Sequence, residues 1–444
     1  MTAAAAPRFR AYGPRHLDEI GARFGIAPAE VEAMKAVAAV LPFRVNDYVL
    51  EELIDWDQAP ADPIHRLVFP QPGALRPADL ARMLRLTRAG VSRVELGTAA
   101  GAVRARMNPH PGQQLTLNRP ALADGAPAPG LQHKYPDTVL FFPSKGQTCH
   151  AYCSYCFRWA QFVGDPALRF AEPDVSVLTG YLRAHPEVES VLVTGGDPLI
   201  MKASQLAGYV EPLLDPALET VRTIRLGTKA LAYWPYRFVS DDDAGELLAL
   251  FERIVRAGRQ LAVMAHFTHP RELSTAAAQE AVRRVVATGA RIYCQAPLIA
   301  GVNDAAATWA ELWTRELALG CTPYYMFVER DTGPRWLFDV PLARAHWIFA
   351  DAYRDLPGLA RTVRGPVMSA TPGKVVIDGV VDVAGERRFA LRYLRARRPE
   401  LAGRPFHARF DPQARWLTDL EPAGPDDAAL LWGEAPDPAP AAAA

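Results

Sequence analysis

Three cysteines close together are the residues of this sequence whose spacing most clearly indicates chemistry. Cys149, Cys153 and Cys156 form a Cys-x3-Cys-x2-Cys pattern, whereas the other two cysteines stand alone in apolar surroundings. Three thiolates this close can converge on one inorganic centre. A four-iron cluster with three cysteine ligands keeps one iron open for a small molecule. A structural zinc ion needs a fourth ligand, for which His150 is a candidate. The pattern favours the iron–sulfur cluster, with zinc as the alternative.

These cysteines follow the first of six short apolar segments rich in β-branched and aromatic residues. The segments begin at Thr138, Ser190, Thr223, Leu261, Arg291 and Pro323. Between them, helical patterns open with a capping residue and end at a glycine, as at 243–258, 275–289 and 304–320. This alternation is typical of parallel strands joined by crossover helices. Six units are too few for a closed eight-stranded barrel. We therefore predict an α/β fold, a partial (βα)6 TIM-like barrel, with its chemistry at the carboxyl ends of the strands.

The remainder of the chain is expected to surround this barrel. We predict a helical N-terminal region, the barrel, a C-terminal extension and a disordered tail, at 1–130, 131–340, 341–415 and 416–444. Helical patterns at 16–24 and 28–41 support the first part, and Pro-rich sequence at 55–72 and 109–129 is expected to be irregular. A helix near 342–353 opens the extension, and the composition of the end of the chain is typical of disorder.

Composition excludes several classes of function. Lys+Arg and Asp+Glu both number 49, so there is no basic excess for binding nucleic acid or anionic lipid. No segment approaches the roughly 18 uncharged apolar residues that cross a bilayer. The N-terminus lacks the apolar stretch of a signal peptide. We therefore expect a cytoplasmic protein that binds neither nucleic acid nor membranes.

Further motifs narrow the chemistry. They are HKYPDTVL before the cysteines, FRW after them, and VLVTGGDPL, IRLGTKALAYWPYR, AHFTHPREL, QAPLIAGVND and PYYMF on the later strands. In this order the chain resembles the lysine 2,3-aminomutase family of radical S-adenosylmethionine enzymes. The resemblance implies a [4Fe-4S] cluster on the three cysteines, S-adenosylmethionine and pyridoxal 5′-phosphate. It also implies an isomerase that moves the α-amino group of an L-α-amino acid to Cβ through a cofactor imine and a 5′-deoxyadenosyl radical.

The resemblance assigns five residues to S-adenosylmethionine. Gly195, Gly196 and Asp197, after the second strand, would hold its amino group, since glycines let a ligand approach the backbone. His266 and Gln295 would contact the same cofactor. Alternatively, the glycines form a tight strand-to-helix turn, and the other two side chains are hydrogen-bonded core residues.

Lys374 matches the family lysine that binds pyridoxal 5′-phosphate as a Schiff base. The alternative is an exposed turn lysine. The family has a longer glycine run before this lysine, of which only Gly373 remains here. Lys134 falls where the family has an arginine on the cofactor phosphate, and Thr138 replaces a second such arginine.

Arg158 matches the arginine that pairs with the substrate α-carboxylate, although a surface ion pair is the alternative. Arg330 and Ala370 stand where the family has two aspartates that hold the distal ammonium of lysine. A cation at 330 suits an acidic side chain, so we expect an acidic or short neutral amino acid to be preferred over lysine. A shift by one residue would present Glu329 or Asp331 instead.

The resemblance also implies an electron donor such as flavodoxin or ferredoxin. The zinc-binding cysteines of the family are missing, so a homo-oligomer would be held in another way. Two alternatives stay open. The same cofactors could act on another amine or on a protein-bound lysine, or the chain could be a zinc-stabilised, non-catalytic binding module.

Overall fold

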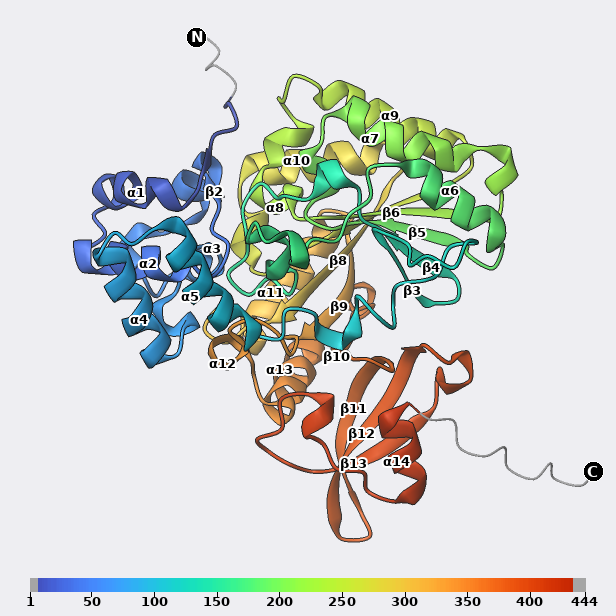
Figure 1. Cartoon of the computed structure of the whole chain (residues 1–444). Coiled ribbons are helices and arrows are strands. Elements are labelled where there is room, and N and C mark those ends of the chain that lie inside the picture. The colour runs from blue at the N-terminus through green and yellow to red at the C-terminus, as the bar shows by residue number, and fades with distance from the viewer. Residues whose placement is uncertain (1–6, 434–444) are drawn as a thin grey trace, which may run out of the picture.

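One sheet of eleven strands runs through the molecule (Figure 1). The computed structural model describes residues 7–433. The strand order is β13-β12-β11-β10-β9-β8-β7-β6-β5-β4-β3. Strands β4 to β10 are parallel, whereas β3 at one edge and β11 to β13 at the other are antiparallel to their neighbours. The sheet is therefore open, with β3 and β13 as its edges.

The six predicted strands are present, each within one residue of its predicted start. They are β4 (Thr138–Phe141), β5 (Ser190–Val193), β6 (Thr223–Thr228), β7 (Gln260–Ala265), β8 (Arg291–Leu298) and β9 (Thr322–Val328). The helices between and after them are α6 (Val175–Ala184), α7 (Ala203–Val210), α8 (Ala230–Tyr233), α9 (Ala244–Arg256), α10 (Ala276–Ala287), α11 (Ala306–Ala318), α12 (Arg335–Phe338) and α13 (Leu342–Arg354). This arrangement confirms the partial (βα)6 barrel.

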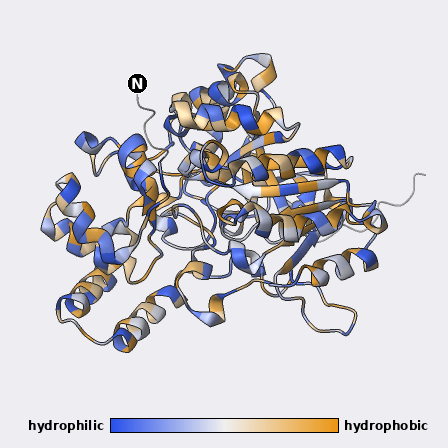
Figure 2. Ribbon diagram, turned by 90° about the horizontal axis from the view of Figure 1, so that it is seen from above, coloured by the Kyte–Doolittle hydropathy of each residue, from blue (hydrophilic) through white to orange (hydrophobic). Residues whose placement is uncertain are grey.

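The helices cover the sheet because each has one apolar face. On α9, Leu247, Leu250, Phe251 and Ile254 are buried, which is the spacing of one side of a helix. Figure 2 shows the same division as orange and blue stretches along the helices. This packing leaves the carboxyl ends of the parallel strands free to carry the loops in which the cysteines and the glycine pair lie.

The N-terminal part consists of helices beside the barrel (Figure 1, blue). They are α1 (Leu17–Phe24), α2 (Pro28–Ala38), α3 (Pro63–Val68), α4 (Pro77–Arg88) and α5 (Arg93–Ala105), with β1 (Ala11–Tyr12) paired to β2 (Val45–Asn46). The stretch 55–72, expected to be irregular, contains α3. The carboxylate of Asp62 accepts from the N–H groups of Ile64 and His65, and Pro63 suits a first helical turn because it needs no donor there.

Residues 364–433 extend the sheet beyond the barrel. Strand β10 (Arg364–Ser369) adds a seventh parallel strand, and β11 (Gly373–Val383), β12 (Glu386–Ala396) and β13 (Pro405–Arg409) follow. The loop that joins β3 (Leu131–Tyr135) to β4 lies at the opposite edge in strand order. The part of the chain that carries Lys374 is thus continuous with the sheet that carries the cysteine loop.

The expectation of a disordered tail from residue 416 is wrong for 416–433. Trp416, Leu417, Leu430 and Leu431 are buried against β11 to β13, and helix α14 (Pro425–Trp432) covers these strands. The Tyr393 hydroxyl donates to the carbonyl of Leu430 over 2.7 Å. A few large apolar residues outweigh the Pro- and Asp-rich composition, because the antiparallel strands offer an uncovered apolar face. Residues 434–444 lie outside the described part of the chain. Within the described part, no helix is long and apolar enough to cross a membrane.

Candidate active site

A cavity of about 330 Å³ lies where the parallel strands end. All twelve predicted site residues line it, namely Lys134, Cys149, Cys153, Cys156, Arg158, Gly195, Gly196, Asp197, His266, Gln295, Arg330 and Lys374. These residues span about 240 positions of sequence, on or directly after β3, β4, β5, β7, β8, β9 and β11. The fold therefore brings the predicted residues to one place.

The three cysteines lie in the loop between β4 and α6. Burial raises the pKa of each thiol, and that of Cys156 rises to about 12. For Cys149 and Cys156 the neighbouring cysteines raise the pKa further. All three residues line the cavity. Three thiols on one wall of a cavity fit the donor set of a cluster, which takes one thiolate at each of three irons. Within residues 7–433, no group of three or more His, Cys, Asp or Glu side chains is arranged to hold a single metal ion.

His150 does not share the cavity with the cysteines. Its ring packs edge-on against Phe9, with ring centroids 5.3 Å apart, and burial lowers its pKa to about 3. It is not one of the residues that line the cavity. His150, the candidate fourth ligand for zinc, therefore packs against an aromatic ring and does not line the cavity with the cysteines.

The glycine pair after β5 packs against the loop that carries Cys149. A Cβ on Gly196 would collide with the backbone of Thr148, and Gly195 has φ +132°, a conformation that L side chains rarely adopt. The Asp197 N–H donates to the Thr148 carbonyl over 2.7 Å. Both glycines thus serve a tight turn and also expose backbone to the cavity.

Asp197 anchors the next strand as well as the glycine turn. Its carboxylate accepts from the Thr228 hydroxyl and from the Lys229 N–H, each over 2.8 Å. Only 2% of the residue is exposed. These hydrogen bonds tie the glycine turn to the end of β6. Asp197 therefore fixes the turn and also lines the cavity.

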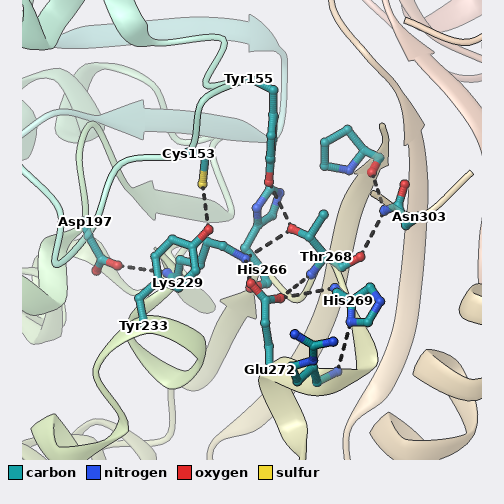
Figure 3. Close-up of polar contacts among 12 residues, drawn as sticks. Cys153, Tyr155, Asp197, Lys229, Tyr233, His266, Thr268, His269, Glu272 and Asn303 are labelled. Atoms are coloured by element: carbon teal, nitrogen blue, oxygen red, sulfur yellow. Dashed lines mark hydrogen bonds and ion pairs between the residues drawn. The ribbon is translucent and has the colours of Figure 1, made fainter. Parts of the chain in front are cut away.

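Lys229 and Glu272 form a buried ion pair beside the cysteine loop (Figure 3). The Lys229 Nζ donates to the Glu272 Oε1 over 2.6 Å, and to the Thr268 hydroxyl and the His266 carbonyl over 3.1 Å each. Glu272 is fully buried, and Lys229 lines the cavity. Such a pair is tolerated in a protein interior only when both charges are hydrogen-bonded, as these are.

The same cluster reaches one of the cysteines. The Tyr233 hydroxyl lies 3.5 Å from the Cys153 Sγ, and the Lys229 Nζ lies 4.4 Å from the centre of the Tyr233 ring (Figure 3). Burial, and then Lys229, lower the pKa of His266 to about 3, so its imidazole is neutral. Sequence reasoning missed Lys229, Tyr233 and Glu272. They lie within the motifs quoted above. However, Lys229 and Tyr233 follow β6 whereas Glu272 follows β7, and no sequence spacing predicts a contact between residues that follow two different strands.

Lys374 lies at the start of β11, directly opposite two cavity residues in the sheet. Its backbone pairs with Ser369 on β10 and with Arg395 on β12. A Cβ on Gly373 would collide with the carbonyl of Arg395, so only glycine allows β12 to approach this closely. The single remaining glycine of this stretch is therefore the one that the geometry requires. The Nζ of Lys374 lies 4.2 Å from the centre of the Tyr325 ring.

Positive charge surrounds Lys374. Burial, and then Arg225, Arg395, Arg364 and Lys134, lower the pKa of the Lys374 amine well below its usual value. A neutral amine is the form that can attack an aldehyde. Around the whole cavity, seven Lys or Arg side chains stand against two acids, Asp197 and Glu329. The cavity is suited to anionic ligands.

Two arginines flank Phe157 on the side nearer the cysteines. The guanidinium carbons of Arg158 and Arg330 lie 4.8 and 5.2 Å from the centre of the Phe157 ring. The Arg158 Nη1 and the Arg330 Nε are buried and have no hydrogen-bond partner in the described part of the chain. Glu329 also lines the cavity, and burial raises its pKa well above the usual value, whereas Asp331 does not line it.

Comparison with known proteins gives several relatives, while no family model matches the chain. A protein of Aquifex aeolicus with the name "Putative L-lysine 2,3-aminomutase" is 33% identical over 395 residues, which cover 89% of this chain and 91% of the relative. The L-lysine 2,3-aminomutase of Bacillus subtilis is 29% identical over 204 residues, 46% of this chain and 40% of the relative. Among solved structures, a radical SAM methyltransferase from Sphaerobacter thermophilus covers 70% of this chain and 96% of its own, at 16% identity and a TM-score of 0.37.

Proposed function

The chain belongs to the lysine 2,3-aminomutase family and is a radical S-adenosylmethionine isomerase, and we propose that it moves the α-amino group of an amino acid to Cβ with pyridoxal 5′-phosphate held at Lys374. Family membership implies a [4Fe-4S] cluster and S-adenosylmethionine. The observation that carries the proposal is that Lys374, with its lowered pKa, lines the same cavity as the three cysteines.

The cofactors supply the reactive chemistry and the protein supplies their placement. When bound, the cluster and S-adenosylmethionine supply a radical that takes a hydrogen atom from carbon, and pyridoxal phosphate carries the migrating nitrogen. Cys149, Cys153 and Cys156 would hold the cluster. Gly195 and Gly196 would offer backbone to the amino group of S-adenosylmethionine.

Asp197, His266 and Gln295 complete the S-adenosylmethionine side of the cavity. All three line it. The neutral imidazole of His266 has one ring nitrogen that can donate and one that can accept a hydrogen bond, without adding charge beside Lys229. Gln295 lies on β8, between β7, which His266 follows, and β9, which Arg330 follows. Its amide can therefore reach a ligand that spans these strands.

Lys374 must bind the aldehyde of pyridoxal phosphate and then release it to the substrate. Its lowered pKa favours the neutral amine, which is the form that both steps need. The rings of Tyr325 and Phe327 lie 4.2 and 5.2 Å from its Nζ and form an aromatic wall beside the amine. Lys134, whose pKa burial also lowers, donates to the carbonyl of Ala370, one residue past the Ser369 that pairs with Lys374.

Arg158 and Arg330 would bind the two ends of the substrate. Arg158 follows the cysteines directly and would pair with the α-carboxylate. Arg330 has an unpartnered Nε, and a segment from the N-terminal part covers it, since its Nη2 lies 3.4 Å from the carbonyl of Pro111. Burial raises the pKa of Glu329 and so disfavours its charged form, which leaves the arginines as the main charges at this end of the cavity. An acidic or short neutral amino acid fits it better than lysine.

The test is a screen of anaerobically purified protein with S-adenosylmethionine, pyridoxal phosphate and a reductant. We expect about four irons per chain, loss of iron and of S-adenosylmethionine cleavage in Cys153→Ala, and a β-amino acid product detected by mass spectrometry. Stoichiometric zinc without iron would reject the cluster. Product formed only from another amine or from a protein-bound lysine would reject the amino-acid substrate.

The role of Lys374 has a separate test. Borohydride should fix pyridoxal phosphate on the peptide that contains Lys374, and Lys374→Ala should keep its iron but lose amino transfer. Lys202→Ala, at an exposed lysine, is the matched control. Label fixed on another lysine, with Lys374→Ala fully active, would overturn the assignment.

A further inference from the structure

We propose that Arg395, on β12, replaces the arginine that position 138 lacks and binds the phosphate group of pyridoxal 5′-phosphate together with Arg225 and the hydroxyl of Tyr135. The inference rests on the proposed function, because it concerns the cofactor held at Lys374. It assigns a binding role to residues of the C-terminal extension that the sequence motifs leave without one.

The pairing of β11 with β12 places Arg395 beside Lys374. The two residues are direct partners on adjacent antiparallel strands, and both line the cavity. Residues in this relation have their Cβ atoms about 5 Å apart on one face of the sheet. An anion bound at Arg395 would therefore lie directly beside Lys374.

Arg395 also reaches the strand on which the arginine is missing. Its Nη1 lies 3.4 Å from the hydroxyl of Thr138, at the start of β4, and its Nη2 contacts the carboxylate of Asp137. Thr138 is nearly fully buried and lines the cavity. The short Thr138 side chain thus leaves room for a guanidinium that arrives from the opposite edge of the cavity.

Tyr135 supplies an unused donor at the same place. Its ring centre lies 4.4 Å from the guanidinium carbon of Arg395, and the residue is 8% exposed. Its hydroxyl is buried and has no hydrogen-bond partner among the described residues, although the residue lines the cavity. A buried hydroxyl without a partner is costly in an interior, and a bound anion would supply the acceptor.

The charge around Lys374 requires a counter-ion. Lys134, Arg225 and Arg395 all line the cavity and all act on the Lys374 amine. In the described part of the chain, the only carboxylate in an ion pair with any of these three is Asp137, which is half exposed. A phosphate dianion matches this group because arginine forks and a hydroxyl are its preferred donors.

The experiment separates the phosphate from the rest of the cofactor by comparing pyridoxal phosphate with pyridoxal. Protein that carries its cluster but no pyridoxal phosphate is mixed with rising concentrations of each aldehyde. The fraction of Lys374 fixed by borohydride is then measured by mass spectrometry. Arg395→Ala should raise the half-saturating concentration of pyridoxal phosphate about ten- to a hundredfold, as expected for charged hydrogen bonds. It should change that of pyridoxal by less than about twofold. Arg225→Ala should behave in the same way.

Two further variants make the test specific. Arg392→Ala, on the same strand but exposed and paired with Asp378, should change neither value. Adding Thr138→Arg to Arg395→Ala should recover part of the affinity for pyridoxal phosphate, because the cation returns to β4. This recovery also shows that the Arg395→Ala chain is folded.

The outcomes distinguish the inference from the function on which it rests. Fixation on Lys374 in the unaltered protein, with an unchanged preference for pyridoxal phosphate in Arg395→Ala, overturns the phosphate site and leaves the proposed function standing. Equal loss of both aldehydes in Arg395→Ala also overturns it, since the residue would then serve the lysine and not the phosphate. Absence of fixation by either aldehyde in the unaltered protein overturns both.

Discussion

The two ends of the cavity handle buried charge in opposite ways. At the cysteine end, which comprises the loop 149–156 and the residues around Lys229, the buried cation has a carboxylate partner 2.6 Å away. At the lysine end, Arg225 and Arg395 lie in the same cavity as Lys374 and Lys134, and an exposed aspartate is the one carboxylate paired with any of the four in the described part of the chain. The buried cation at the cysteine end thus has its partner within the protein, whereas the proposed partner of the arginines at the lysine end is a bound anion.

This difference indicates which end of the cavity contributes to the stability of the fold and which end contributes to ligand binding. A paired charge in an interior contributes to a fixed structure, and breaking the pair is strongly destabilising. An unmatched cluster of cations costs stability in the free protein, and a bound anion recovers that cost as affinity. The following predictions test whether the two ends differ in this way.

Breaking the pair at the cysteine end should have the largest effect on stability. Glu272→Ala leaves Lys229 buried without a counter-charge, and we expect the free energy of unfolding to fall by about 3–5 kcal/mol. Urea denaturation of the ligand-free protein measures this. Glu252→Ala, in the exposed pair with Arg256, should cost no more than about 0.5 kcal/mol. An equal loss of unfolding free energy in Glu272→Ala and Glu252→Ala would show that the buried pair does not stabilise the cysteine end more than an exposed pair does.

Reversing a charge at the substrate side should change specificity. Arg330→Asp removes the cation that, in the proposed function, faces the distal end of the substrate. Two like charges about 4 Å apart repel by roughly 4 kcal/mol at an effective dielectric of 20. We expect the ratio of kcat/KM for lysine to that for an acidic amino acid to rise by two orders of magnitude or more. Efficient use of lysine by the unaltered enzyme would contradict this prediction and would mean that Glu329, Asp331 or another acid holds the ammonium.

The lowered pKa of Lys374 makes stability depend on pH. In the unfolded chain a lysine stays protonated up to about pH 10.4, whereas the folded protein releases this proton at lower pH. The unfolded state therefore binds more protons between the two values, and the stability contribution of this residue rises with pH across that window. Lys374→Met should flatten the rise in urea midpoint as the pH approaches about 10 in ligand-free protein. An unchanged slope would mean that the amine is charged when folded.

Removing a cation from the lysine end should have the smallest effect, with the opposite sign from the first prediction. Arg225→Met relieves repulsion in the ligand-free protein, and we expect a gain of up to about 1 kcal/mol in unfolding free energy. The same variant should lose the extra stability that pyridoxal phosphate gives to the unaltered protein. A loss of several kcal/mol without ligand would show that Arg225 has a structural partner.

The two ends also differ in how far sequence predicts them. The six strands could be predicted because apolar runs mark parallel strands. The spacing of the three cysteines indicated a site, and the resemblance to the family supplied the other nine cavity residues. Arg395 could not, because it lies in a stretch with many other arginines, and only the pairing of β11 with β12 distinguishes it. The tail at 416–433 was mispredicted because its composition does not reveal the apolar face that it covers.

The cover over Arg330 has a consequence for how such an enzyme could diversify. The segment near Pro111 comes from the N-terminal part and lies outside the eleven-stranded sheet that carries the cysteine loop and Lys374. A Cβ on Gly112 would crowd the Arg330 guanidinium, so a single substitution there would reshape the substrate side. Selection for a new amino-acid substrate can therefore act on the loop near Pro111, while the residues that serve the radical chemistry stay unchanged.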